Sequence, residues 1–288
     1  MNKFSSLLII ASLAFGLNAC KEVGPDIDLG RGKATVQDTT YIESPIATPE
    51  AKNVVIEEFT GVRCPNCPQG HQIIASIKAA HPDNVVSMSL HPSNSLGYPY
   101  VFSTENFITA EAQNLYEYLG LLGLEPCAAI DRHLFSGESN VLLDKSKWTG
   151  YVNQQLATTT PVNIVLNKSY DTATRELTVI AEVHYTQTIT NDNKLTIALV
   201  ESGMVSAQLN GSVIDTFYTH NDIQRAFITD TKGDAITSTT EAGRVVRRVY
   251  KKTLDALWKP ENMKIIAYVH EYQNDIKVVY QGKELDVQ

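Results

Sequence analysis

Two cysteines separated by two residues, Cys64 and Cys67, are the side chains of this sequence best suited to chemistry. The run from Val54 to Phe59 before them predicts a buried strand, and hydrophobic residues at helical spacing follow them. A separation of three residues brings two sulfurs within disulfide distance on one helical turn. Unpaired N–H groups and the dipole at a helix start stabilise a thiolate, so the pair predicts thiol–disulfide exchange.

Side chains next to the pair suggest accessory roles. Arg63 directly precedes Cys64, and its positive charge would favour the thiolate. His71 lies four residues after Cys67 and therefore on the same face of the predicted helix. This histidine either tunes the sulfurs or faces the solvent, and the sequence leaves both interpretations open.

The cysteines also allow roles that involve no exchange. Cys64 and Cys67 can form a static structural disulfide, as cysteines of exported domains often do. A zinc site would need this pair with Cys127, and either His71 or His91 as the fourth ligand. No second Cys-x-x-Cys supports such a site. Cys127 itself is either a third exchange partner or a small buried hydrophobic residue.

The start of the chain predicts export. Lys3 precedes a short apolar run from Leu7 to Phe15, which is far below the length of about twenty residues that crosses a bilayer. The residues Leu17 to Cys20 then resemble the lipobox of bacterial lipoproteins. That resemblance implies cleavage after residue 19, lipidation of Cys20 and anchoring in a membrane by the lipid. An ordinary cleavage site before a cysteine is the alternative.

Composition narrows the class of partner. The chain of 288 residues has a formal charge of −8 and a pI near 5.4, which argues against nucleic acid as a partner. Four cysteines are too few for a disulfide scaffold in a chain of this length. We find no phosphate-binding glycine loop, calcium loop or serine–histidine–acid motif, so the sequence predicts neither a cofactor nor a metal.

Changes of pattern along the chain predict its organisation. Residues 1–19 form the signal peptide and residues 20–50 a lipid-anchored linker, with one added strand near residues 35–41. Residues 51–158 alternate strand and helix, with a helical insert, and predict an α/β domain. Residues 159–288 carry alternating runs separated by turns, which predict an all-β sandwich of the immunoglobulin-like kind. The fold class is α+β overall.

The stretch from Val54 to Cys67 resembles the active-site strand and helix of the thioredoxin superfamily. That resemblance implies two further site residues. Glu58 matches the buried acid that handles the proton of the second cysteine. Pro126 matches the proline that follows a cis peptide bond and faces the disulfide.

A narrower resemblance adds a location. The lipobox, the Cys-Pro-x-Cys segment and the sequence from Tyr218 to Phe227 together are similar to the twenty-eight-kilodalton outer membrane protein (Omp28-related) family of lipoproteins. The likeness is expected over most of residues 50–288. It implies an outer-membrane location and a thioredoxin-like domain. It implies no particular role for His220 and Arg225, for which a local turn-stabilising network is the default interpretation.

Two functions follow as hypotheses. The first is a lipid-anchored thiol–disulfide oxidoreductase that acts on protein thiols or disulfides of the cell envelope. Cys64 would attack, Cys67 would resolve, Glu58 would take the proton, and Pro126 would help to dock the substrate. The second is a surface binding or adhesion lipoprotein, in which the disulfide is structural and the thioredoxin-like fold is only a scaffold.

Overall fold

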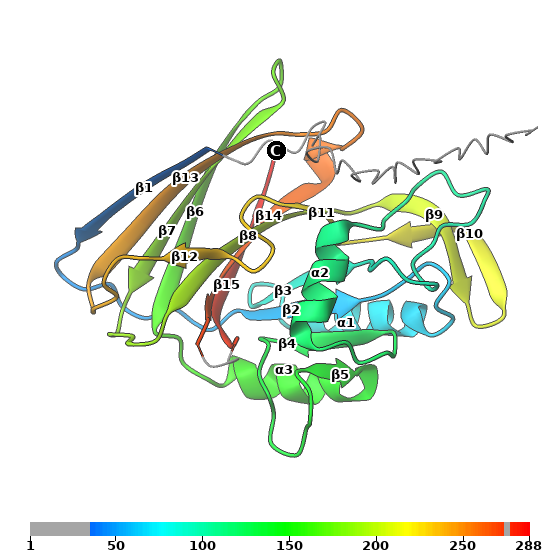
Figure 1. Ribbon diagram of the computed structural model, residues 1–288, viewed down its shortest axis with the longest axis horizontal. Coiled ribbons are helices and arrows are strands. Elements are labelled where there is room, and N and C mark those ends of the chain that lie inside the picture. The colour runs from blue at the N-terminus through cyan, green and yellow to red at the C-terminus, as the bar shows by residue number, and fades with distance from the viewer. Residues whose placement is uncertain (1–34, 274–276) are drawn as a thin grey trace, which may run out of the picture. The chain divides into compact units, whose positions relative to one another are not determined.

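A computed structural model describes residues 35–273 and 277–288 of the chain (Figure 1). The predicted signal peptide, the lipidation of Cys20 and the linker up to residue 34 lie outside these residues. Strand β1 (Thr35–Ile42) confirms the added strand that was expected near residues 35–41. No helix in the described part of the chain is both long and apolar enough to span a membrane.

The strand, turn, helix and strand predicted around the cysteines are all present. Strand β2 (Val54–Phe59) is buried along its whole length and leads through the cysteine loop into helix α1 (Cys67–Ala80). Strand β3 (Val85–Leu90) returns parallel to β2. On its other side β2 pairs with the antiparallel strand β4 (Cys127–Ile130), which the predicted helical insert precedes as α2 (Ala110–Leu119).

Alternation along β2 divides the core around it into two parts. Val54 and Ile56 pack with residues of α1 and of α3 (Trp148–Leu156), whereas Val55 and Phe59 pack with residues of α2. The helices therefore cover both faces of the sheet at this point. By the same alternation, Glu58 shares the α1 face with Val54 and Ile56.

The second half of the chain contributes to two sheets. A four-stranded antiparallel sheet has the order β1-β13-β7-β6, and a nine-stranded sheet has the order β15-β14-β8-β11-β3-β2-β4-β5, with β12 paired to β8. The remaining elements of these sheets and their connections are β5 (Leu142–Asp144), η1 (Lys145–Lys147), β6 (Val162–Asp171), β7 (Glu176–Tyr185), β8 (Asn193–Glu201), β11 (Ile223–Phe227), β12 (Asp234–Ile236), β13 (Arg244–Thr253), η2 (Pro260–Asn262), β14 (Met263–Glu271) and β15 (Val279–Asp286).

This pairing differs from the expectation of a self-contained sandwich over residues 159–288. Strand β11 pairs parallel to β3 at Ile223 and Ser89, so strands from the second half extend the sheet that carries the cysteine loop. All of the described residues belong to one compact unit. Alternating runs predicted strands in this half of the chain, but they do not determine which strands become neighbours.

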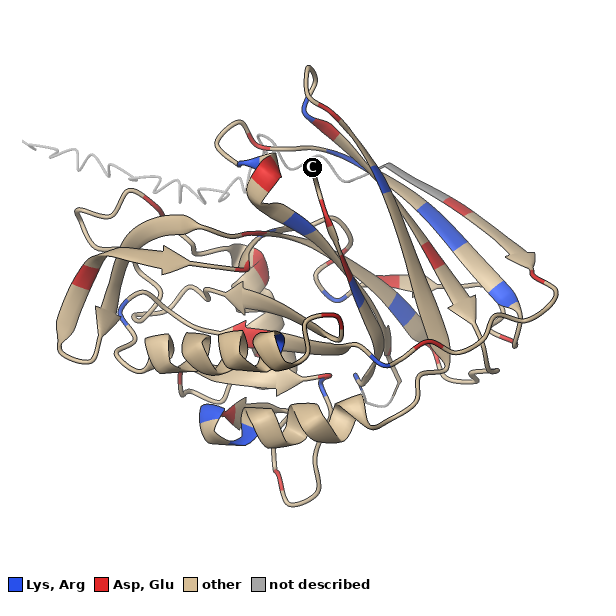
Figure 2. Ribbon diagram, turned by 180° about the vertical axis from the view of Figure 1, so that it is seen from behind, with Lys and Arg blue, Asp and Glu red and all other residues tan. Residues whose placement is uncertain are grey.

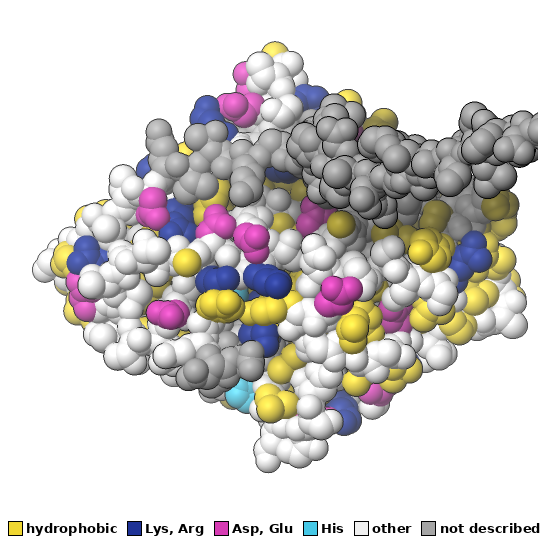
Figure 3. All heavy atoms as spheres, in the orientation of Figure 1, with side chains coloured by type: hydrophobic (Ala, Val, Ile, Leu, Met, Phe, Trp, Pro, Cys, Tyr) yellow, Lys and Arg dark blue, Asp and Glu magenta, His cyan; other side chains and the backbone are white. Residues whose placement is uncertain are grey.

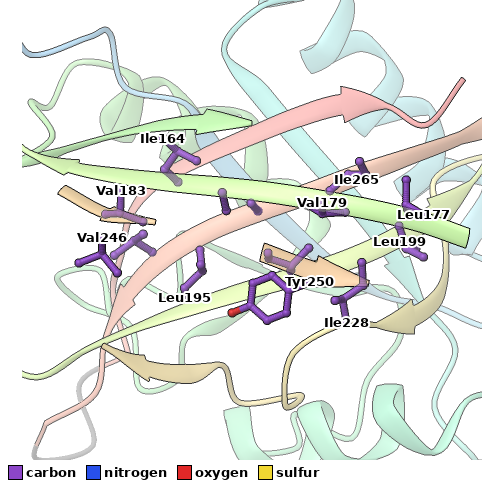
Figure 4. Close-up of a cluster of buried hydrophobic side chains, with 14 of the residues drawn as sticks. Ile164, Leu177, Val179, Val183, Leu195, Leu199, Ile228, Val246, Tyr250 and Ile265 are labelled. Carbon is purple, nitrogen blue, oxygen red and sulfur yellow. The ribbon is translucent and has the colours of Figure 1, made fainter. Parts of the chain in front are cut away.

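A sandwich-like core nevertheless exists between the two sheets (Figure 4). Side chains of β6, β7 and β13, such as Ile164, Val179 and Tyr250, meet side chains of β8 and β14, such as Leu199 and Ile265. All five are at most 1% exposed. Burial of these apolar surfaces supplies the main stabilisation of this half.

Lys, Arg, Asp and Glu residues lie along the strands of the four-stranded sheet (Figure 2). The cations Arg247, Arg248 and Lys251 of β13 each form an ion pair with an acid of β7 or β1. Each pair compensates the charge of its cation across neighbouring strands.

A separate hairpin lies beside the cysteine loop. It consists of β9 (Met204–Asn210) and β10 (Val213–His220), which pair with each other and with no further strand of the described chain (Figure 1). An irregularity in the pairing between Asp215 and Tyr218 divides the hairpin. We call residues 207–215 the tip of the hairpin, and residues 204–206 with 218–220 its base.

Candidate functional site

Cys64 and Cys67 form a disulfide in which the Cα atoms are 5.4 Å apart. Helix α1 begins at Cys67, with Pro68 in its first turn, so Cys64 lies in the loop just before the helix. Pro65 suits the first position of a helix, but the helix begins two residues later, at Cys67. Cys64 is 1% exposed and Cys67 is 0% exposed, so neither sulfur is open to a large substrate in this conformation.

The tip of the hairpin holds the cysteine loop through hydrogen bonds. The Leu209 N–H donates to the carbonyl of Val62 at 2.8 Å, and the Gly211 N–H donates to the carbonyl of Pro65 at 2.9 Å. The buried amide of Gln208 donates to the carbonyls of Gly61 and Cys64, each at 3.2 Å. No local sequence pattern predicts this cover, because its residues lie more than 140 positions after the cysteines.

Glu58 lies buried under the first turns of α1. A Cβ atom added to Gly70 would lie 2.9 Å from Glu58 Oε1, 3.1 Å from Pro126 and 3.1 Å from Trp148. Gly70 is one helical turn beyond Cys67, so the acid, the proline and the second cysteine share one region beneath the helix. The close approach of these side chains requires glycine at position 70.

The environment of Glu58 favours the protonated carboxyl and brings its pKa close to neutral pH, where both the carboxyl and the carboxylate are populated. Burial raises the pKa of Glu58 to about 8, and the Ser89 hydroxyl, which donates to Oε2 at 3.0 Å, opposes this shift only in part. Glu58 Oε1 is buried and has no hydrogen-bond partner among the described residues. Buried acids with strongly perturbed pKa values gather at functional sites, which makes Glu58 a candidate proton carrier.

We predict a specific pH dependence for Glu58→Gln. The folded protein binds a proton at Glu58 that the unfolded chain releases above about pH 4.5. The contribution of Glu58 to stability is therefore present at low pH and is lost as pH rises toward the folded-state pKa of about 8. Relative to Glu58→Gln, the wild type should lose up to about 1.4 kcal/mol of unfolding free energy per pH unit between about pH 5 and 8. Urea unfolding of both proteins measures this, and a constant difference would contradict it.

The His71 side chain is 18% exposed, and its ring nitrogens contact oxygen atoms rather than a sulfur. Its Nε2 lies 3.0 Å from Thr60 Oγ1 and 3.7 Å from Glu58 Oε1, and its Nδ1 lies 2.8 Å from the hydroxyl of Tyr218 in the hairpin base. Burial lowers the pKa of His71 to about 3, with a smaller contribution from His220, so the imidazole is neutral. The contact with Tyr218 was not predicted from the sequence.

A cavity of about 500 Å³ opens beside His71. Its lining includes Glu58, His71, Lys78, Tyr218 and Asp222. Lys78 and Asp222 form an ion pair of 2.7 Å, so their charges compensate each other. The cavity is large enough for several water molecules.

Pro126 and Arg63, which were also predicted as site residues, both lie in loops. The Glu125–Pro126 peptide bond is cis, the geometry that the thioredoxin resemblance implies, and Asn94 donates a hydrogen bond to the side chain of Glu125. Arg63 donates to the carbonyls of Tyr98 and Pro99 and lies over the ring of Tyr100, so it organises that loop.

Cys127 is a free thiol in the core on the α2 face of the sheet. Burial raises the pKa of this thiol to about 12, so it is a poor nucleophile at neutral pH. His91 is buried against Phe107, with ring centroids 5.2 Å apart. Across the described ranges, no group of three His, Cys, Asp or Glu side chains is arranged to hold a metal ion.

Comparison with known families decides the relationship of this chain. The sequence model described as "Outer membrane protein Omp28" matches residues 112–285, which is more than half of the chain. The chain belongs to the Omp28 family. The match begins after the cysteine loop, so residues 50–111, for which a likeness was also expected, lie outside it.

Solved structures agree with the fold of this Omp28-family chain. HBP35 of Porphyromonas gingivalis is similar with a TM-score of 0.66 and 19% sequence identity, over 82% of this chain and 76% of that one. A crystal structure of protein AGR_C_4864 from Agrobacterium tumefaciens has a TM-score of 0.51 and 12% identity, over 84% of this chain and 97% of that one. No curated protein sequence is detectably similar to the chain.

Proposed function

We propose that this Omp28-family chain is a thiol–disulfide oxidoreductase of the outer membrane, anchored by a lipid on Cys20, which acts on protein thiols or disulfides of the cell envelope. The observation that carries the proposal is the buried carboxyl of Glu58 beneath the helix that begins with Cys67. Burying an acid without a cationic partner costs stability, and a proton-handling role explains why the fold keeps it.

The arrangement around the disulfide supports a thioredoxin-like assignment of this part. A buried strand, a Cys-Pro-Asn-Cys loop and a helix follow one another, and a cis proline packs near the same helix. The two-sheet packing in the second half supports an immunoglobulin-like relationship more weakly, since several of its strands extend the sheet of the first half.

In the proposed reaction the reduced pair transfers two electrons to a substrate disulfide. The Cys64 thiolate attacks one substrate sulfur, forms a mixed disulfide and releases the other as a thiolate. Cys67 loses its proton to the Glu58 carboxylate and attacks the Cys64 sulfur. This second attack releases the remaining substrate thiolate and forms the Cys64–Cys67 disulfide.

The burial of both sulfurs requires the tip of the hairpin to open during this cycle. Beyond the buried residues Ala207 and Gln208, the tip contributes little to the core, since Val213 is 66% exposed and Ile214 is 40% exposed. Figure 3 shows hydrophobic side chains at the surface in the region of β9 and β10, at the right of the view. Segments with few buried contacts open at low free-energy cost, and the irregularity after Asp215 supplies a hinge.

Gln208→Ala tests this opening. Loss of the amide that donates to the Gly61 and Cys64 carbonyls should weaken the closed tip by about 1–2 kcal/mol. Reduction of the disulfide by dithiothreitol should then become about tenfold faster. The matched control is Gln281→Ala, another buried glutamine, whose amide donates to Ala51 away from the hairpin. Equal acceleration in the control would show that general loosening is responsible.

The same burial favours a second candidate, in which the disulfide is structural and the protein binds a partner at the cell surface. The reduction potential of Cys64–Cys67, measured on the full chain in mild detergent against glutathione and dithiothreitol buffers, separates the two functions. We expect a potential above about −300 mV for a working couple. A potential below that value, with no reduction of insulin by the protein, would favour the structural disulfide.

A further inference from the structure

The Glu58 side chain has almost no solvent-accessible surface in the folded protein. The residue is 0% exposed, and Oε1 has no hydrogen-bond partner among the described residues. An acid that takes a proton in each catalytic cycle must also release it in each cycle. A neighbouring group that reaches the solvent is therefore needed.

His71 is placed to be that group. Its Nε2 is 3.7 Å from Glu58 Oε1, and its side chain is 18% exposed, whereas the Glu58 side chain is 1% exposed. Both residues line the same cavity of about 500 Å³. A distance of 3.7 Å is too long for a hydrogen bond, but Nε2 is held at 3.0 Å by Thr60 Oγ1 on the same side. A small rotation of the ring exchanges one partner for the other.

Tyr218 fixes the opposite side of the imidazole. Its hydroxyl lies 2.8 Å from His71 Nδ1, and the two rings are tilted against each other with centroids 5.8 Å apart. Tyr218 belongs to the base of the hairpin, beyond the irregularity that follows Asp215. The tip can open over the cysteines while the base keeps Tyr218 on His71.

We propose that His71 carries the proton from Glu58 to the cavity. Tyr218 is the positioning residue that orients the imidazole of His71. The proposal rests on the oxidoreductase function proposed above. It assigns a role in the reaction to the hairpin base, which otherwise only completes the fold.

The relay returns every group to its starting protonation state. Cys67 gives its proton to the Glu58 carboxylate as its sulfur attacks Cys64 and the substrate thiolate leaves. The protonated carboxyl then donates to His71 Nε2, while the proton on Nδ1 passes through the Tyr218 hydroxyl to water in the cavity. Glu58 is again a carboxylate, and a flip of the ring or a reverse transfer resets the imidazole tautomer. No electrons move in this step.

The charged and titratable groups around the imidazole do not supply a competing route. His220 of β10 is buried, and burial lowers the pKa of His220 to about 4, so it is neutral like His71. Asp222, which lies between β10 and β11, is paired with Lys78 of α1 at 2.7 Å. Lys264 of β14 lines the same cavity and is paired with Glu284.

The resolving step can be followed by itself with an aromatic disulfide that releases a coloured thiolate, dithiobis(nitrobenzoate). The reduced full-length protein should release one equivalent when Cys64 attacks and a second when Cys67 resolves the mixed disulfide. His71→Ala should slow the second release about 10- to 100-fold at neutral pH and leave the first unchanged. Added imidazole, which fits the vacated space, should restore most of the lost rate.

Two further variants keep the test independent of folding defects. Tyr218→Phe keeps the ring and removes only the hydroxyl, and it should slow the second release about 3- to 10-fold. Gln72 is an exposed residue next to His71 on the same helix, and it also lines the cavity. Gln72→Ala is therefore the control and should have no effect on the second release. The Cys64→Ser/Cys67→Ser double variant measures the background from other thiols.

The outcomes separate the two proposals. Normal resolution in both His71→Ala and Tyr218→Phe, with a wild type that resolves, would overturn the relay alone. Slow resolution in His71→Ala that imidazole does not restore would also overturn it, because it would indicate a structural role. A wild type that shows no release dependent on Cys64 would overturn the oxidoreductase function, and the relay with it.

Discussion

Cys64→Ser should reduce the rate at which the protein catalyses insulin reduction by dithiothreitol to the uncatalysed background, a loss of at least about a hundredfold. Serine lacks a thiolate at neutral pH, so no mixed disulfide can form. The assay uses the full chain in mild detergent and follows the precipitation of the insulin B chain. Cys127→Ser is the matched control, because its thiol is buried and weakly acidic, and its rate should equal that of the wild type.

Cys67→Ser adds an independent readout of the same prediction. Without a resolving thiol, the mixed disulfide between Cys64 and the substrate should accumulate, and mass spectrometry of the quenched reaction detects it. If Cys64→Ser and the wild type reduce insulin at the same rate, and Cys67→Ser traps no substrate, the disulfide is structural.

Arg132→Met should destabilise the fold by about 3–5 kcal/mol. Arg132 is 1% exposed and donates two hydrogen bonds of 2.7 Å to the carboxylate of Glu57, and a third to the hydroxyl of Tyr268. Tyr268 in turn donates to Glu57 at 2.8 Å. Removal of the guanidinium leaves the buried carboxylate without its cation. Urea unfolding of the full chain measures the change.

Arg247→Met is the control for the loss of an arginine charge. Arg247 lies at the surface, 35% exposed at its side chain, and pairs with Glu182 at 3.2 Å. We expect a change below about 1 kcal/mol there. The double variant Glu57→Leu/Arg132→Met should recover much of the stability lost in Arg132→Met, because it removes both buried charges. An equally small effect of both single variants would contradict the assignment of a buried network.

This network shows which part of the fold sequence reasoning missed. Glu57 lies in the buried run that predicted β2, and Tyr268 lies 211 positions later in β14. Neither residue carries a local signal that it contacts the other. Their contact joins the first and second halves of the chain. Strands of the second half also extend the first sheet, which the predicted boundary near residue 158 did not anticipate.

The features of the candidate site also divide into those that were predicted from the sequence and those that were not. The spacing of Cys64 and Cys67 and the hydrophobic pattern around them predicted the strand, loop and helix, because hydrogen bonding and burial within a single segment are set by adjacent residues. Resemblance added Glu58 and Pro126, and the structure places both next to Gly70 of the same helix. The burial of the sulfurs and the contact of His71 with Tyr218 were not predicted.

By itself, the sequence determined the periodicity of the strands and helices, the position of the cysteine pair at the junction of β2 and α1, and membership in the Omp28 family. Only the tertiary structure decided that the hairpin covers the disulfide and that strands of the second half extend the first sheet. The physical reason is that helix and strand patterns repeat over a few residues, whereas contacts between distant segments depend on how all buried surfaces fit together.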